Sequence, residues 1–185
     1  MYYHCSNIGG LTRLEPKKPQ NFEKPAQVYM TTSLPMALMY GIRNFEYTYG
    51  YRHGQIYYAE YFPDALRLLY GNKSAYLYVC NPQTTEKTAI PNEVVSPAAV
   101  EVTEEIYIPD VLEALLEQER LGALEILRYE DLTPKMLDWI FRAELGEIKE
   151  RNLLQERSPM AAYMKQHYPD VWDYACKEAN KTPEA

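Results

Sequence analysis

The sequence contains 185 residues, of which 46% are hydrophobic and 24% are charged, and its formal net charge is -7. This composition supports a folded core and argues against a disordered chain, while the negative charge argues against general binding to DNA or RNA. No apolar run approaches the roughly 20 residues of a membrane span, and the opening residues MYYH lack the basic and apolar parts of a signal peptide. We therefore expect a cytoplasmic protein that neither inserts into a membrane nor binds nucleic acid generally.

The first half of the chain holds most of the 18 tyrosines, and its aromatic and β-branched runs, bounded by turn residues, predict strands. The predicted strands are Tyr2–Ser6, Gln27–Thr31, Gln55–Glu60, Ala75–Cys80, Glu93–Val95 and Val100–Ile108. Two short helices, Pro35–Arg43 and Pro63–Tyr70, are predicted between them. The lysine- and proline-bearing residues 12–25 are expected to form a surface loop, and Tyr47–Gly54 a mobile aromatic loop.

The second half of the chain carries most of the negative charge, and its apolar residues recur at helical spacing. Helix-start signals occur at Thr133, Ser158 and Pro169. We therefore predict an α+β protein: a mixed or antiparallel β core with short helices over residues 1–108, followed by an acidic helical region over 109–185. This second region is expected to pack on the core and not to fold independently.

The three cysteines, Cys5, Cys80 and Cys176, are scattered, and no CxxC or Cys/His spacing occurs. A zinc site or a disulfide framework is therefore not expected, and free thiols agree with a reducing compartment. Cys80 lies in an apolar run and is predicted to be a buried strand residue, although a catalytic thiol stays open for each of the three.

Four short segments of the β-rich half carry residues that together suggest chemistry. His4–Ser6 ends the first predicted strand, and Tyr29 lies on the second. Ala37 and Tyr40 are one turn apart on the following helix, and Asn92–Val95 forms a late strand that contains Glu93. Singly, each has an ordinary explanation, as a structural histidine, a core tyrosine or a solvent-facing glutamate; their order and spacing favour a shared site.

This order resembles the His-Tyr-Glu branch of the ADP-ribosyltransferase fold, which includes the poly(ADP-ribose) polymerases. In that branch a histidine begins an H-G-[ST] motif on the first strand, and a tyrosine begins the next motif strand. A helix with a small residue and a second tyrosine follows, at the offsets of Ala37 and Tyr40 from Tyr29. Asn92–Val95 is similar to the family's "Asn-Glu-Tyr-Ile" strand. The resemblance implies transfer of ADP-ribose from NAD to an unknown acceptor, or hydrolysis of NAD.

The resemblance also implies roles for individual residues. Glu93 would bind the ribose 2'-hydroxyl and stabilise the positive charge that develops at the ribose C1 when nicotinamide leaves. Tyr40 would pack against nicotinamide, with Tyr29 beneath or opposite it. His4 would fix the adenosine ribose and so support catalysis, and Ser6 would add a hydroxyl nearby. NAD is then the substrate, a protein is a candidate acceptor, and no metal is needed.

Two positions depart from the family pattern and keep an alternative open. Cys5 stands where the family has glycine, and Ala37 stands where it has serine. The second hypothesis is therefore an inactive ADP-ribosyltransferase-like module that binds a nucleotide, a peptide or another small ligand. The related RNA 2'-phosphotransferases are a weaker match, because the few arginines before residue 109 form no recognisable motif.

A third hypothesis is an interaction protein that uses its acidic helices. An apolar stripe at helical spacing would then dock a partner or form a homodimer, whereas the simpler interpretation is that it packs on the β-rich core. The stripe consists of Leu137, Ile140, Phe141, Leu145 and Ile148.

Overall fold

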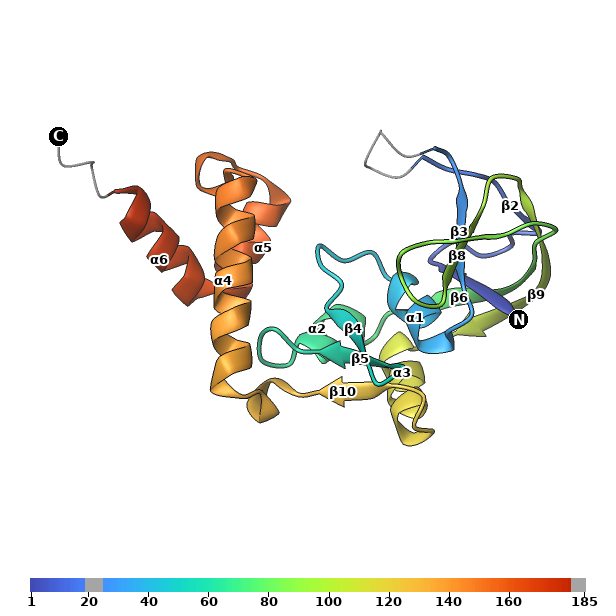
Figure 1. The fold of residues 1–185 in the computed structure, drawn as a ribbon, viewed down its shortest axis with the longest axis horizontal. Helices are drawn as coiled ribbons and strands as arrows, with labels where there is room; N and C mark the ends of the chain where they lie inside the picture. Colours follow the sequence, from blue (N-terminus) through green and yellow to red (C-terminus); the bar gives the residue numbers. More distant parts are fainter. Residues whose placement is uncertain (19–24, 181–185) are drawn as a thin grey trace. The chain divides into compact units, whose positions relative to one another are not determined.

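A computed structural model describes residues 1–18 and 25–180 (Figure 1). The chain divides into two compact units, one formed by residues up to 58 and 66–126, the other by 59–65 and the chain from 127 onward. The division after Ile108 that the sequence suggested differs from this one, because the helix and strand between residues 109 and 126 belong with the first unit. Among the described residues, no helix is both long enough and apolar enough to cross a membrane.

The first unit is built on a seven-stranded sheet with the order β2-β9-β6-β1-β3-β8-β7, and the pairings resolved in it are antiparallel. Its strands are β1 (Tyr2–Ser6), β2 (Arg13–Leu14), β3 (Val28–Thr31), β6 (Ala75–Asn81), β7 (Glu86–Lys87), β8 (Glu93–Ser96) and β9 (Val100–Ile108). The α+β class and the antiparallel core are therefore confirmed. The expectation of a loop over 12–25 was wrong at β2, which pairs with β9 through Arg13↔Glu101 and Leu14↔Val100. Residues 19–24 of that predicted loop lie outside the described residues.

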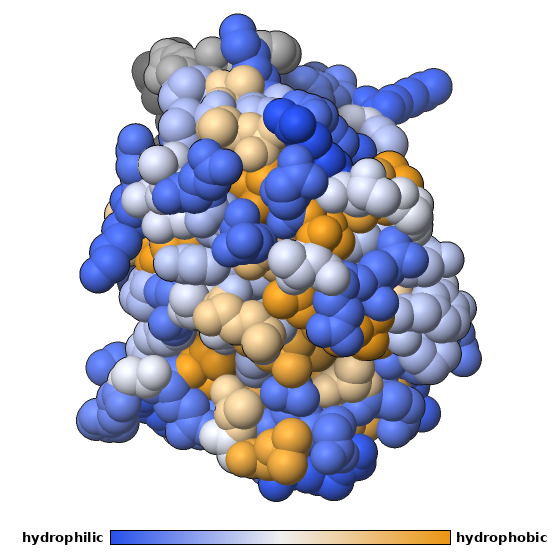
Figure 2. Space-filling model, turned by 90° about the vertical axis from the view of Figure 1, so that its right-hand side faces the viewer, coloured by the Kyte–Doolittle hydropathy of each residue, from blue (hydrophilic) through white to orange (hydrophobic). Residues whose placement is uncertain are grey.

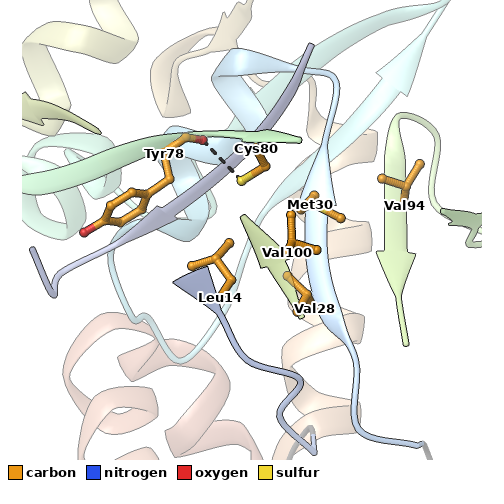
Figure 3. Packing of buried hydrophobic residues seen from close by; sticks show 7 residues of the cluster. All are labelled: Leu14, Val28, Met30, Tyr78, Cys80, Val94 and Val100. Carbon is orange, nitrogen blue, oxygen red and sulfur yellow. Dashed lines mark hydrogen bonds between the residues drawn. The ribbon is translucent and has the colours of Figure 1, made fainter. Parts of the chain in front are cut away.

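A buried hydrophobic cluster stabilises this sheet, and its side chains come from five of the strands (Figure 3). Its buried members are Leu14, Val28, Met30, Tyr78, Cys80, Val94 and Val100. Full burial of one such aliphatic side chain contributes about 1.5–3 kcal/mol. The short strand β2 is held in place by its one inward residue, Leu14, which is 5% exposed.

A second, three-stranded sheet has the order β10-β5-β4, with β4 at Tyr49–Arg52, β5 at Gln55–Ala59 and β10 at Glu125–Leu127. Strands β4 and β5 are joined by His53 and Gly54, which both have positive φ (53° and 83°). A two-residue connection of this kind suits the twist of a β-hairpin. The mobile loop expected over Tyr47–Gly54 is therefore mostly a paired strand and its turn.

Three helices accompany the sheets of the first unit: α1 (Leu34–Tyr40), α2 (Ala65–Tyr70) and α3 (Val111–Arg120). Helix α1 begins because the Ser33 side chain accepts a hydrogen bond from the Met36 amide and Pro35 occupies its first turn. Asp110 caps α3 in the same way, through the amides of Leu112 and Glu113.

The second unit contains the helices α4 (Pro134–Glu150), α5 (Pro159–His167) and α6 (Pro169–Ala179). Their starts confirm the signals in the sequence: Thr133 and Ser158 accept hydrogen bonds from amides of the first turns of α4 and α5. Ile140 and Ile148 of the apolar stripe are buried. Phe141 meets Tyr174 of α6 edge to face, with ring centroids 5.5 Å apart, so this residue of the stripe packs within its own unit.

Figure 2 shows one face of the protein coloured by hydropathy. Hydrophobic residues gather in the central part of this face, and hydrophilic residues lie among and around them. Exposed apolar side chains interspersed with polar ones are usual on protein surfaces, so this pattern alone defines no docking site.

Candidate functional site

A cavity of about 420 Å³ lies in the first unit, lined by residues of β1, β3, α1 and the start of β8. The lining residues are Tyr3, His4, Cys5, Tyr29, Met30, Thr31, Met36, Ala37, Tyr40, Ile90 and Glu93. Four of the five site residues expected from the sequence thus converge here, although they come from four separate elements.

The fifth expected residue, Ser6, does not line this cavity. It lies on a neighbouring hollow of about 340 Å³, which shares His4 and Tyr29 with the first one. The Ser6 hydroxyl accepts a hydrogen bond from the Ile8 amide (3.1 Å), so its local role is to hold the turn that follows β1.

The His4 imidazole occupies a fixed orientation between the two hollows. Its Nδ1 lies 2.9 Å from the carbonyl oxygen of Tyr29, and because a carbonyl only accepts, Nδ1 must carry the hydrogen. Burial lowers the pKa of His4, and the charge of Lys17 lowers it further, although the hydrogen bond to Tyr29 opposes this. At neutral pH the ring is therefore neutral and its Nε2 is a hydrogen-bond acceptor.

Tyr40, the last residue of α1, belongs to a cluster of aromatic rings. Its ring lies 4.8 Å from that of Tyr47 and 5.9 Å from that of Tyr49, and the hydroxyls of Tyr40 and Tyr49 are 2.8 Å apart. Burial is the main cause that raises the pKa of Tyr40, followed by the hydrogen bond to Tyr49. The phenol consequently stays protonated, and its ring offers an apolar surface to the cavity.

Glu93 is the first residue of β8 and is presented by a turn. The preceding residue, Asn92, has a left-handed backbone (φ 64°), a conformation that asparagine tolerates better than most residues. The Thr88 hydroxyl donates a hydrogen bond to Glu93 Oε1 (2.8 Å). The negative charge of Glu93 helps to raise the pKa of Tyr40 and of Tyr49, after burial in each case, so the carboxylate lies within electrostatic range of the aromatic cluster.

Cys5 and Ala37, the two departures from the family pattern, both line the cavity. The Cys5 sulfur packs against Gly41, where an added Cβ atom would clash with it. Burial raises the pKa of the Cys5 thiol to about 12. The thiol is therefore protonated at neutral pH, which argues against a nucleophilic role.

No group of three or more His, Cys, Asp or Glu side chains in the described part of the chain is arranged to hold a metal ion. The polar groups of the cavity are instead one imidazole, one carboxylate and the hydroxyls of tyrosine and threonine. Such a set is suited to binding a small polar ligand by hydrogen bonds and aromatic contact.

Tyr49 and Tyr51 were not among the expected site residues, yet both contact groups that line or adjoin the cavity. Tyr49 meets Tyr40, and the Tyr51 hydroxyl donates a hydrogen bond to the Pro91 carbonyl oxygen (2.8 Å). The sequence carried a signal for them, because tyrosines at positions 47, 49 and 51 alternate with the period of a strand. Gly50, between Tyr49 and Tyr51, and Gly54, which follows them, favoured a loop instead.

Comparison with models of known protein families finds no match, and a search of curated proteins finds no similar sequence. The case for a function therefore depends on the residues of the cavity and their geometry.

Proposed function

We propose that the protein is an NAD-dependent ADP-ribosyltransferase, which transfers ADP-ribose from NAD to an acceptor or hydrolyses NAD. The observation that supports this proposal is that His4, Tyr29, Tyr40 and Glu93 line one cavity of about 420 Å³. That volume is within the range of small-molecule sites.

In the proposed reaction the bond between the ribose C1 and the nicotinamide nitrogen breaks. Nicotinamide leaves as a neutral molecule with the electron pair of that bond, and positive charge develops on the ribose. The Glu93 carboxylate would bind the ribose 2'-hydroxyl and stabilise that charge. The acceptor, which is a protein side chain or water, forms the new bond to C1 and releases its proton to the solvent.

The other residues of the cavity would bind and orient NAD. Tyr40 and Tyr29 would contact nicotinamide with their aromatic surfaces, which favours the planar leaving group and excludes water. The neutral Nε2 of His4 would accept a hydrogen bond from a hydroxyl of the adenosine ribose. The hydrogen bond from Nδ1 to Tyr29 keeps the imidazole in the tautomer that this role needs.

The second candidate is a binding module that has lost the reaction. Its supporting observation is the presence of Cys5 and Ala37 on the cavity wall, since Ala37 offers no hydroxyl to hold the nicotinamide amide. This candidate predicts that NAD or a related nucleotide binds but is not consumed.

Calorimetric titration of the purified protein with NAD, followed by chromatographic measurement of free nicotinamide, tests both candidates. The proposal predicts binding with a dissociation constant between about 1 µM and 1 mM, together with release of nicotinamide. Binding without release would select the second candidate. The absence of any binding at millimolar NAD would contradict the proposal and would restrict the second candidate to ligands other than NAD.

A further inference from the structure

We propose that strand β4 positions two parts of the cavity wall: Tyr49 holds Tyr40, and Tyr51 holds the turn that carries Glu93. The structural part of this inference concerns the hairpin itself, and its catalytic part rests on the proposed function. Of the described residues that line the cavity, none belongs to β4. Tyr49 and Tyr51 are therefore positioning residues and not catalytic ones.

The geometry of β4 places both tyrosines on one face. Residues two apart in a strand point to the same side, and the rings of Tyr49 and Tyr51 meet edge to face with centroids 6.4 Å apart. Gly50, between them, points to the opposite face, where the Tyr57 ring covers it.

Tyr49 contacts the part of the cavity lining that comes from α1, namely Tyr40. Its hydroxyl lies 2.8 Å from that of Tyr40, and the two rings are in edge contact at 5.9 Å. Tyr40 is the last residue of α1 and is 38% exposed, so a hydrogen bond and an aromatic contact from outside the helix restrict the motion of its ring.

Tyr51 contacts the turn that carries Glu93, whose carboxylate lines the cavity. Its hydroxyl donates to the Pro91 carbonyl oxygen at 2.8 Å and accepts from the Asn92 side-chain amide at 3.3 Å. Asn92 also has a backbone contact, because its carbonyl oxygen accepts a hydrogen bond from the Thr32 amide (2.9 Å). Asn92 is thus held in its left-handed conformation by both contacts, and Glu93 follows directly in the chain.

The strand is a rigid support for both contacts. All four residues of β4 pair with β5, and Ile56 and Tyr58 of β5 are buried at 4% and 1% exposure. Since successive same-face residues in a strand are about 6.5–7 Å apart, one short strand fixes the spacing between the groups that would hold the leaving group and the ribose.

Three variants that each remove one hydroxyl test this inference: Tyr51→Phe, Tyr49→Phe and, as a matched control on the opposite face of the same hairpin, Tyr57→Phe. Three quantities are measured for each variant: the kcat for nicotinamide release, the KM for NAD, and the hydrogen–deuterium exchange of residues 88–93. Melting temperature checks that each variant is folded.

We expect Tyr51→Phe to lower kcat about 10-fold with little change in KM. A misplaced Glu93 carboxylate stabilises the transition state less well, whereas the binding of the substrate in its ground state changes little. It should also increase exchange in residues 88–93. Tyr49→Phe should chiefly raise KM, because it frees the ring of Tyr40 that contacts nicotinamide, and Tyr57→Phe should change none of the three quantities.

Different results would overturn the positioning role of β4 and the proposed function. If the wild-type protein releases no nicotinamide, the proposed function fails, and the exchange of residues 88–93 alone decides whether Tyr51 holds the turn. Unchanged exchange in Tyr51→Phe would overturn the positioning role of Tyr51, whatever the activity. In an active protein, equal effects of Tyr51→Phe and Tyr57→Phe on kcat would overturn the link to Glu93.

Discussion

The Nδ1 atom of His4 on β1 donates a hydrogen bond to the carbonyl oxygen of Tyr29 on β3, 2.9 Å away. In the sheet β1 and β3 are neighbours, with Tyr3 opposite Thr31, and here a side chain takes up a carbonyl of the adjacent strand. The contact joins two of the expected site residues and selects the tautomer whose Nε2 is free of hydrogen.

Acidification is expected to weaken both NAD binding and the folded state through His4. Burial lowers the pKa of His4 below its ordinary value of 6.5, so the unfolded chain takes up the proton first as the pH falls, and stability decreases below that value. Protonation also converts Nε2 from an acceptor to a donor. Unfolding by urea and titration with NAD at about pH 7.5 and about pH 5.5 measure both effects.

The variant His4→Gln supplies the comparison for this prediction, because glutamine keeps hydrogen-bonding groups but does not titrate in this range. Its stability should change less between the two pH values than that of the wild type. An equal loss in both proteins would assign the pH dependence to other groups.

Truncation of Leu14 tests the assignment of β2 to the core. Leu14→Ala should lower the free energy of unfolding by about 2–5 kcal/mol, because it leaves a cavity in the main hydrophobic cluster. Arg13→Ala on the same strand is the matched control. Its side chain is exposed and forms surface ion pairs with Glu15 and Glu101, so the loss should stay below about 1 kcal/mol. If urea unfolding gave similarly small losses of unfolding free energy in both variants, Leu14 would not be a core residue, and the segment would be better described as a surface loop.

We expect a stable fold to require glycine at position 41, because the Cys5 sulfur packs against that position. Gly41→Ala would bring a Cβ atom against the Cys5 sulfur and should destabilise the fold by about 1–3 kcal/mol, and Cys5→Ala in the same chain should recover part of that loss. Gly146→Ala in α4 is the control, since its Cβ would meet no atom within 4 Å, and it should stabilise the helix by about 0.5–1 kcal/mol. Thermal and urea unfolding would be measured for the wild type, Gly41→Ala, Cys5→Ala, the double variant and Gly146→Ala. Losses in Gly41→Ala and Cys5→Ala that simply add in the double variant would contradict this account.

Much of the sheet was predictable, because its long strands carry their own pattern. Val100–Ile108 and Tyr2–Ser6 have the predicted bounds as β9 and β1. Strand β2 is only two residues long and is followed closely by prolines and lysines, so no local pattern reveals it; its pairing with a distant strand determines it. Strand β10 is likewise defined by its place beside β5, a contact that no local sequence signal encodes.

The sequence grouped four residues that line one cavity, but it did not indicate the contacts that support them. His4, Tyr29, Tyr40 and Glu93 were selected by their order and spacing, and all four line the same cavity. The contacts of Tyr51 with Pro91 and Asn92 join residues about forty positions apart, and only the folded hairpin brings them together. Ser6 illustrates the converse, since closeness in sequence to His4 did not place it on the same cavity.

The central claim is that Glu93 is the carboxylate of an NAD-consuming site, and the rate of nicotinamide release by the wild type and by Glu93→Gln tests it most directly. Glutamine keeps the shape and can still accept the hydrogen bond from Thr88, so the melting temperature and NAD affinity should change little. Loss of the charge that stabilises the developing cation should reduce kcat by about 100-fold or more. Wild-type release that persists undiminished in Glu93→Gln would contradict the account.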